Sequence, residues 1–151
     1  MALDDDIALL ARVPVLGGMG REALRLLAFA AETRQLRTGD VLFRKDDTSD
    51  SGYVVAMGTV AMLDEGGQDA ALVGPGALIG ELALISETRR PATAVAREPT
   101  TVLRISRPMF RRTLEEYPQV AQRLAGALRE RVLGMSKDLS AVRRRLTDLD
   151  E

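Results

Sequence analysis

The chain has no cysteine and no histidine, and these two absences remove several kinds of chemistry. Without thiols or imidazoles it has no disulfide, no zinc site built from those ligands, and no nucleophile activated by a histidine base. The remaining sequence places no candidate general base beside a nucleophile and shows no cluster of metal ligands. We therefore expect neither an enzyme nor a protein with a resident cofactor or metal.

An excess of charge of one sign is also missing. The 21 Lys and Arg residues nearly balance the 22 Asp and Glu residues, so no global basic field favours nucleic acid. No apolar run approaches the roughly 18 residues that cross a bilayer. The N-terminus carries Asp4, Asp5 and Asp6 instead of the basic flank of a signal peptide. These features predict a soluble protein. The lack of cysteine is compatible with the cytoplasm, where we expect it.

The pattern of apolar residues changes near Thr33. Before it, a spacing of three and four predicts helices over residues 4–12 and 21–31. After it, short apolar runs separated by Gly and Asp predict an antiparallel β-barrel or jelly roll. The eight predicted strands cover residues 33–37, 41–43, 52–57, 59–64, 70–73, 77–80, 92–96 and 101–105. The fold class is α+β, in a single domain 1–151 with N-terminal helices over 1–32, the barrel over 33–105 and C-terminal helices over 106–151.

The C-terminal part of the sequence predicts two helical segments. Ser106 is a candidate N-cap for a helix that ends near Glu116, with Pro108 in its first turn. From residue 118 onward a longer pattern repeats apolar residues at alternating spacings of four and three: Leu128, Val132, Met135, Leu139, Val142, Leu146 and Leu149. The flanking charges are opposite across a parallel pair, which favours a homodimer through a coiled coil over 128–149. The alternative is a single amphipathic helix that lies back on its own barrel.

The stretch over residues 80–94 reads GELALISETRRPATA and carries the most specific signal. A short helix there would direct its first N–H groups at an anion. Arg90 would add a forked donor for a phosphate, and Glu81 would accept from a sugar hydroxyl. Together they describe a site for a ribose phosphate. The alternative is a surface turn in which Arg90 pairs with Glu87 or Glu98.

This stretch resembles the phosphate-binding cassette of the cyclic nucleotide-binding domain family, which includes the catabolite activator protein and the regulatory subunits of protein kinase A. The family pattern is G-E-L-A-L, a short variable turn, and R-[AST]-A. The flanks are similar too: TGDVLFRKDD has Asp46 where a glycine is usual, and GYVVAMGTVAML has Gly58 at a tight turn. We interpret Gly58 as a requirement of the backbone, not of a ligand.

The resemblance implies a set of ligand contacts. The N–H groups of Glu81 and Leu82 and the side chain of Arg90 would hold a cyclic phosphate, and Glu81 would accept from the ribose 2′-hydroxyl. Apolar side chains would wall the sugar and base, or alternatively belong to plain barrel core. The long helix would reach the ligand as well. The ligand-binding residues expected on this basis are Val73, Ile79, Gly80, Glu81, Leu82, Arg90, Pro91, Ala92, Arg131, Met135 and Ser136.

Two departures from the family pattern bear on affinity and selectivity. Pro91 stands where the family uses an N–H to bind the phosphate, and proline has none. That loss is worth on the order of 1.5–3 kcal/mol, or about 10- to 100-fold in affinity, unless Arg89 compensates. Met135 replaces a polar group that reads the base, so the choice between cAMP and cGMP does not carry over.

The function expected is a non-enzymatic regulatory module that binds cAMP or cGMP through the 80–94 cassette and signals through its C-terminal helix. The alternative is a degenerate barrel without ligand that serves as a dimeric protein-interaction scaffold. A DNA-binding regulator would need a helix-turn-helix domain, and none follows Glu151. We therefore expect a free-standing sensor, or a fragment of a longer protein, with a downstream protein partner and without nucleic-acid or membrane partners.

Overall fold

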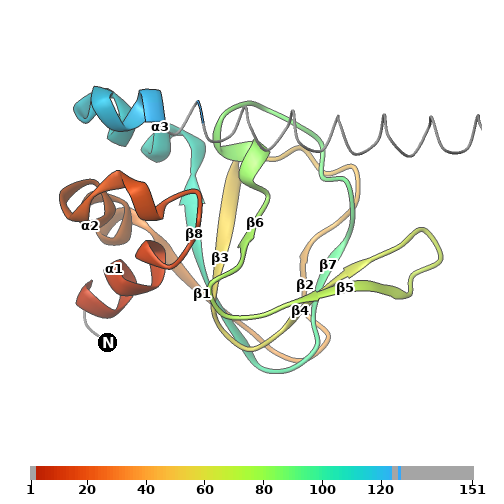
Figure 1. Ribbon diagram of the computed structural model, residues 1–151. Helices are drawn as coiled ribbons and strands as arrows, with labels where there is room; N and C mark the ends of the chain where they lie inside the picture. The colour runs from red at the N-terminus through yellow and green to blue at the C-terminus, as the bar shows by residue number, and fades with distance from the viewer. Residues whose placement is uncertain (1–2, 124–125, 127–151) are drawn as a thin grey trace, which may run out of the picture.

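Two four-stranded antiparallel sheets face each other, and helices cover the outer side of one of them (Figure 1). The computed structural model describes residues 3–123 and 126. The first sheet has the order β1-β8-β3-β6 and the second the order β2-β7-β4-β5. Helices, eight strands and a closing helix follow one another along the chain, so the predicted α+β barrel is confirmed. The predicted coiled coil over 128–149 lies outside the described residues.

The observed strands match the predicted ones closely. They are β1 Glu32–Leu36, β2 Val41–Phe43, β3 Ser51–Met57, β4 Val60–Leu63, β5 Asp69–Val73, β6 Leu78–Ile79, β7 Ala94–Ala96 and β8 Thr100–Ser106. The helices are α1 Leu3–Ala11, α2 Arg21–Ala30 and α3 Arg107–Glu116, with short 3-10 turns η1 Gly17–Met19 and η2 Glu81–Leu84. Ser106 is the N-cap of α3, as predicted: its side chain accepts from the Met109 N–H at 3.3 Å.

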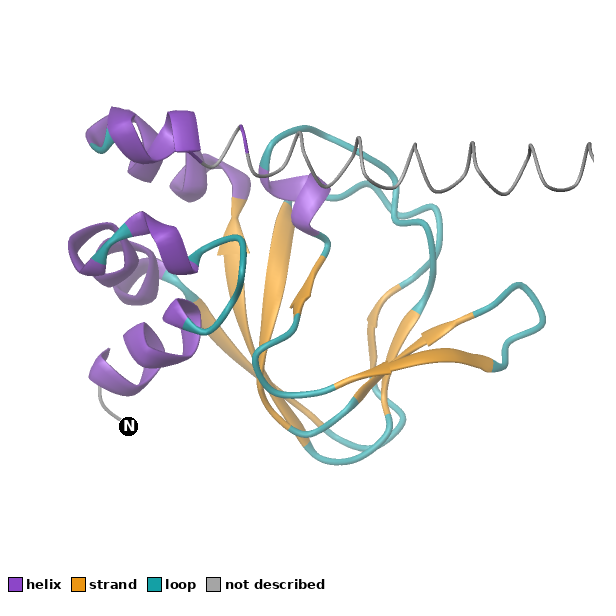
Figure 2. Cartoon of the chain, in the orientation of Figure 1, coloured by secondary structure: helices purple, strands orange, loops and turns teal. Residues whose placement is uncertain are grey.

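Strand β3 is buried on both faces and separates two cores. Successive side chains of a strand point to opposite faces, so Val54 joins the core under the helices while Tyr53 and Val55 face the second sheet. Leu103 and Val102 of β8 divide in the same way. Figure 2 shows the helices on the outer side of the sheet that contains these strands. One sheet thus anchors the helices and forms a wall of the barrel interior.

Three strands are shorter than the sequence predicts. The strand expected over 59–64 covers Val60–Leu63. The strand expected over 77–80 ends at Ile79, because Gly80 takes a left-handed conformation with φ 79° and begins η2. The strand expected over 92–96 begins only at Ala94. Before it, residues 88–90 pair with the loop between β2 and β3: the Arg90 N–H donates to the Asp47 carbonyl at 2.8 Å. The cassette is therefore tied to that loop before its chain enters β7.

The loop between β2 and β3 contains one residue in an unfavourable conformation. Asp46 has φ 71°, and among the described residues other than glycine it is the one with positive φ. Its N–H donates to the Arg90 carbonyl at 2.8 Å, so pairing with the cassette holds it there. This conformation explains in physical terms why the family pattern usually has glycine at this position.

Replacing Asp46 with glycine should therefore stabilise the fold. We expect Asp46→Gly to raise the free energy of unfolding in urea by about 0.5–1 kcal/mol, because relief of left-handed strain exceeds the entropy cost of glycine. Asp47→Gly is the control. Its carboxylate accepts from the Arg44 N–H at 3.0 Å, and loss of that bond should cost about 1 kcal/mol. Destabilisation by Asp46→Gly would show that the aspartate is not strained.

Candidate functional site

The side chain of Arg90 points into the barrel, where it is 4% exposed. A buried arginine is rare unless its charge is paired, because transfer of an ion out of water is costly. The predicted alternative, a surface arginine paired with Glu87 or Glu98, is wrong. Glu98 instead accepts from the Thr59 hydroxyl at 2.9 Å. The cassette thus delivers a cation to the space between the two sheets.

The contacts of the Arg90 guanidinium leave one nitrogen unused. Nη2 donates to the carbonyl of Ser51 at 2.7 Å. The guanidinium carbon lies 4.3 Å from the ring centre of Phe43 and 5.6 Å from that of Tyr53. Nη1 has no hydrogen-bond partner, and among the described residues it is the only buried side-chain nitrogen or oxygen of which this is true. An unsatisfied buried donor of this kind is available to bind an anion.

The electrostatic surroundings of Arg90 also favour the binding of an anion beside its guanidinium. Burial lowers the pKa of the Arg90 guanidinium, while Tyr53, Asp50 and Asp47 act in the opposite direction. Lowering the pKa means that the surroundings favour the charged form less than water does. An anion beside Nη1 would supply an opposite charge and an acceptor for this donor.

Gly80 makes room for the unpaired nitrogen. Its φ of 79° disfavours any other residue, and a Cβ there would overlap Nη1 of Arg90. Directly after it, the first hydrogen bond of η2 runs from the Ala83 N–H to the Gly80 carbonyl at 3.0 Å. The N–H groups of Glu81 and Leu82 therefore precede the helical bonding of η2. The start of η2 and the end of the Arg90 side chain converge on the same place.

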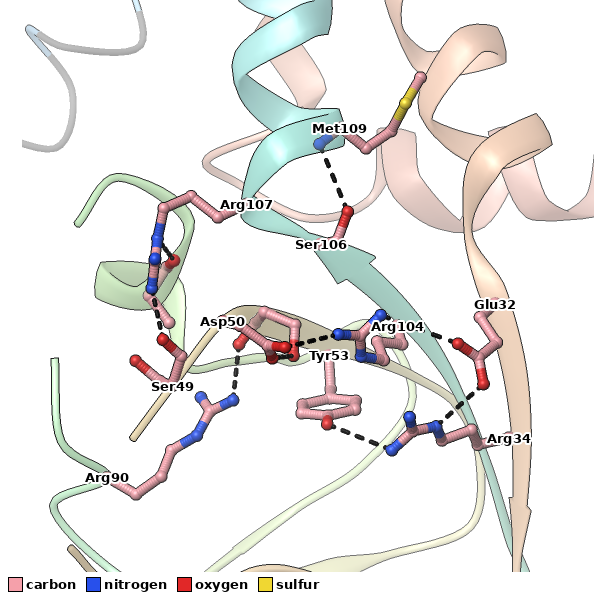
Figure 3. A network of polar contacts seen from close by, with 12 residues as sticks. Glu32, Arg34, Ser49, Asp50, Tyr53, Arg90, Arg104, Ser106, Arg107 and Met109 are labelled. Atoms are coloured by element: carbon pink, nitrogen blue, oxygen red, sulfur yellow. Dashed lines mark hydrogen bonds and ion pairs between the residues drawn. The ribbon is translucent and has the colours of Figure 1, made fainter. Parts of the chain in front are cut away.

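A chain of polar contacts begins at the Tyr53 hydroxyl and runs along the sheet wall (Figure 3). Arg34 donates to the Tyr53 hydroxyl at 3.5 Å and to Glu32 at 3.3 Å. Arg104 bridges Glu32 at 3.7 Å and Asp50 at 3.0 Å. Burial alone would raise the pKa of Asp50, but the Ser51 hydroxyl and Arg104 hold it below its ordinary value. These contacts fix the strand ends beside the Ser51 carbonyl that holds Arg90.

Two arginines of α3 hold the cassette from its outer side. Arg107 donates through Nε to the Ala83 carbonyl at 2.7 Å and through Nη2 to the Ser49 carbonyl. One turn further, Arg111 donates to the Ile85 carbonyl at 3.4 Å. The C-terminal end of η2 and the loop that leads into β3 are therefore joined to the first two turns of α3, as Figure 3 shows for Arg107.

The other predicted site residues differ in how deeply they are buried. Ile79 is buried in the core between the sheets, and Val73 packs against that core. Leu82 is 48% exposed, so it is not part of that core. Pro91 is exposed and Ala92 half-buried. The structure brings Ile79, Gly80 and Arg90 together. Arg131, Met135 and Ser136 lie outside the described residues.

Sequence reasoning missed the residues that surround Arg90. The sequence predicts Phe43 and Tyr53 as strand residues and Arg107 as a helix residue, and it assigns Ser51 to no strand. A signal was available for the two rings, because the chain has only three Phe and two Tyr residues, and both rings sit in segments that match the family. Nothing in the sequence indicates that the Ser51 carbonyl or Arg107 binds parts of the cassette.

Two further kinds of feature are not found in the part of the chain that the structure describes. No group of three or more acidic side chains there could hold a metal ion, and no helix there is long and apolar enough to cross a membrane.

The crowding of Gly80 by Arg90 can be tested by unfolding in urea. Gly80→Ala should lower the free energy of unfolding by about 1–3 kcal/mol, because it adds an overlap with Arg90 to the strain of positive φ. The cost should fall clearly in an Arg90→Ala background. Gly39→Ala is the control, since Gly39 has φ 91° with nothing within 4 Å, and so reports strain alone. Equal costs in both backgrounds would show that the two residues do not compete for space.

Comparisons with known proteins agree with the geometry. Residues 33–117 match the cyclic nucleotide-binding domain family. Cyclic AMP receptor protein of Thermus thermophilus is 34% identical over 123 residues, which are 79% of this chain and 57% of that protein. Lysophospholipase nte1 of Aspergillus fumigatus is 33% identical over 134 residues, which are 83% of this chain and 9% of that protein. A cyclic nucleotide-binding-like protein of Brucella abortus has a solved structure with a TM-score of 0.67 and 45% identity, covering 74% of this chain and 99% of that one.

This chain spans somewhat more than half of the Thermus receptor and a small part of the lysophospholipase. The family match covers the barrel, the cassette and α3, begins after α1 and α2, and takes in more than half of the chain. The eight strands in two sheets and the cassette between β6 and β7 have the order that the resemblance implied. The chain belongs to the cyclic nucleotide-binding domain family.

Proposed function

We propose that this protein is a regulatory module that binds a cyclic nucleotide, cAMP or cGMP, inside the barrel. The observation that carries the proposal is Nη1 of Arg90, a buried cationic donor without a partner. A cyclic phosphate supplies both the charge and the acceptor that this donor lacks. Family membership favours this ligand among the phosphates that a single arginine could bind.

The rest of the cassette completes the binding mode that we propose. The N–H groups of Glu81 and Leu82 at the start of η2 donate to the phosphate, and the Glu81 carboxylate accepts from the ribose 2′-hydroxyl. Ile79 and Val73 line the space beside the sugar. Arg131, Met135 and Ser136 of the C-terminal segment cover the ligand from outside. Pro91 offers no N–H, so affinity is lower than a complete cassette would give.

The contacts of α3 supply a route from ligand to C-terminal helix. Ligand contacts at Arg90 and Glu81 bias the position of η2, and Arg107 and Arg111 join η2 to α3. A ligand shifts such an equilibrium only by its difference in affinity for the two positions. The C-terminal segment then carries the change to a homodimer partner through its heptads, and onward to a downstream protein.

The proposed module acts without catalysis and without nucleic-acid or membrane partners. It is a binding protein in the cytoplasm, not an enzyme, and it needs no nucleic acid or membrane to act. The lysophospholipase match does not suggest catalysis here, because it covers 9% of that protein. The matched relatives are longer proteins, and we do not propose that this chain shares the activity of their other parts.

Calorimetric titration with cAMP and cGMP tests the ligand directly. We expect saturable binding by the wild type and a loss of at least about 30-fold in Arg90→Ala, because a charge-assisted bond worth about 2–3 kcal/mol disappears. Arg44→Ala is the matched control, since it removes the same charge from an exposed position on the neighbouring loop. Its affinity should stay close to wild type. A folded wild type that binds neither nucleotide would refute the proposal.

Pro91 is the observation that favours a second candidate function, a ligand-free dimeric scaffold. The same titration with Pro91→Ala separates the two functions. Restoring the N–H should strengthen binding about 10-fold or more if the protein is a sensor with a weakened cassette. Absence of binding both in the wild type and in Pro91→Ala would favour the scaffold.

A spin label tests the dimer and the signal together. Because the chain has no cysteine, Lys137→Cys places one label per protomer, on the outer side of the predicted coiled coil. We expect a defined distance between labels that changes when nucleotide is added. Arg107→Ala should still bind nucleotide but should reduce that change, because the link between η2 and α3 is cut. The absence of any dipolar coupling between labels would contradict the dimer.

A further inference from the structure

Two aromatic rings enclose the guanidinium that we assign to the ligand. Phe43 of β2 and Tyr53 of β3 belong to different sheets, and their ring centres are 6.0 Å apart at an interplanar angle of 35°. Both side chains are buried, with exposures of 7% and 5%. The Arg90 guanidinium lies over both rings, nearer to Phe43 at 4.3 Å than to Tyr53 at 5.6 Å. The cation therefore rests on ring faces at the junction of the two sheets.

We propose that Phe43 is the positioning residue of the anion site, which holds Arg90 in its binding orientation before the ligand arrives. This inference rests on the proposed function, since it assigns a role in that same site. Phe43 acts only through Arg90 and does not itself contact the phosphate. Tyr53 supports it from the other sheet.

Two different contacts orient the Arg90 guanidinium: an aromatic ring contacts its face, and a carbonyl accepts from its edge. A guanidinium is planar, and its face is attracted to the negative face of an aromatic ring while its edge carries the N–H donors. Phe43 takes the face, and the Ser51 carbonyl takes Nη2 at the edge. Nη1 is what remains, and it lies beside Gly80 at the start of the cassette. The orientation of the free donor is thus set by contacts that a ligand need not disturb.

Tyr53 is itself held in place from behind. Arg34 donates to its hydroxyl at 3.5 Å, and the guanidinium of Arg34 lies 5.9 Å from its ring centre. Arg34 in turn pairs with Glu32 at 3.3 Å. Figure 3 shows Tyr53 with Arg34 on one side and Arg90 on the other. The second ring of the enclosure therefore has little freedom to turn away.

Holding Arg90 in place before the ligand binds should increase the affinity for the ligand. An arginine has several rotatable bonds, and fixing such a side chain on binding costs enough to change affinity by about 2- to 10-fold. A ring that already holds the guanidinium removes that cost from the binding step. An aliphatic side chain of similar size fills the core but has no quadrupole to hold a cation. Isoleucine is apolar and close to phenylalanine in size, so Phe43→Ile should fold.

The test compares Phe43→Ile with Phe43→Tyr, which keeps the ring, and with Val102→Ala. Val102 is fully buried in the same core, and its truncation reports lost packing alone. Each protein is titrated with cAMP and with adenosine, or with cGMP and guanosine if cGMP binds better. We expect Phe43→Ile to weaken the cyclic nucleotide about 2- to 10-fold while the nucleoside is unchanged. Phe43→Tyr should restore the wild-type ratio, and Val102→Ala should lower stability without changing it.

A second measurement needs no ligand. In the nitrogen–proton correlation spectrum of the free protein, the Nε–H signal of Arg90, identified by its loss in Arg90→Ala, should shift in Phe43→Ile because the ring current is gone. An unshifted signal, or an unchanged affinity ratio in Phe43→Ile, would overturn the inference. If the wild type binds no nucleotide, the proposed function fails and the role of Phe43 in binding fails with it, even where the spectrum shows the ring contact.

Discussion

The structure depends on how a guanidinium is accommodated between two sheets. Removing the charge of Arg90 from water is costly, and the barrel offsets that cost with two ring faces and one carbonyl while one nitrogen stays unpaired. The surrounding features follow from this constraint. Gly80 is left-handed and has no Cβ because Nη1 occupies that space. The loop that contains Asp46 adopts a strained backbone because it pairs with the arginine's own peptide groups.

The two-sided sheet connects this site to the helices. Its inner face carries Tyr53 toward the arginine, and its outer face carries Val54 and Leu103 toward the helical core. Strand β8 of the same sheet leads directly into α3 at Arg107, and Arg107 donates to a carbonyl of the cassette. A shift of η2 therefore reaches α3 through hydrogen bonds to carbonyl groups and not through side-chain packing alone. The proposed signal would use these hydrogen bonds between η2 and α3.

The sequence predicted the fold and part of the site well, for physical reasons. Strand periods of two, Gly and Asp turns and the capping Ser106 are local signals, so eight strands and three helices were found within a few residues. The resemblance drew attention to Arg90, but sequence alone left open whether that side chain faces solvent. Its burial depends on the pairing of residues 88–90 with a loop 40 residues earlier, which is a tertiary property. The contacts of Phe43 and Arg107 were missed because ring-to-cation and side-chain-to-carbonyl contacts have no sequence period.

A crystal structure of the protein with bound cAMP or cGMP tests the central claim most directly. The account predicts that Nη1 of Arg90 donates to an oxygen of the cyclic phosphate, while Nη2 remains on the Ser51 carbonyl and the guanidinium stays over Phe43. A nucleotide bound elsewhere, with Nη1 still unpaired inside the barrel, would contradict the account and show that the buried arginine is not the anion site.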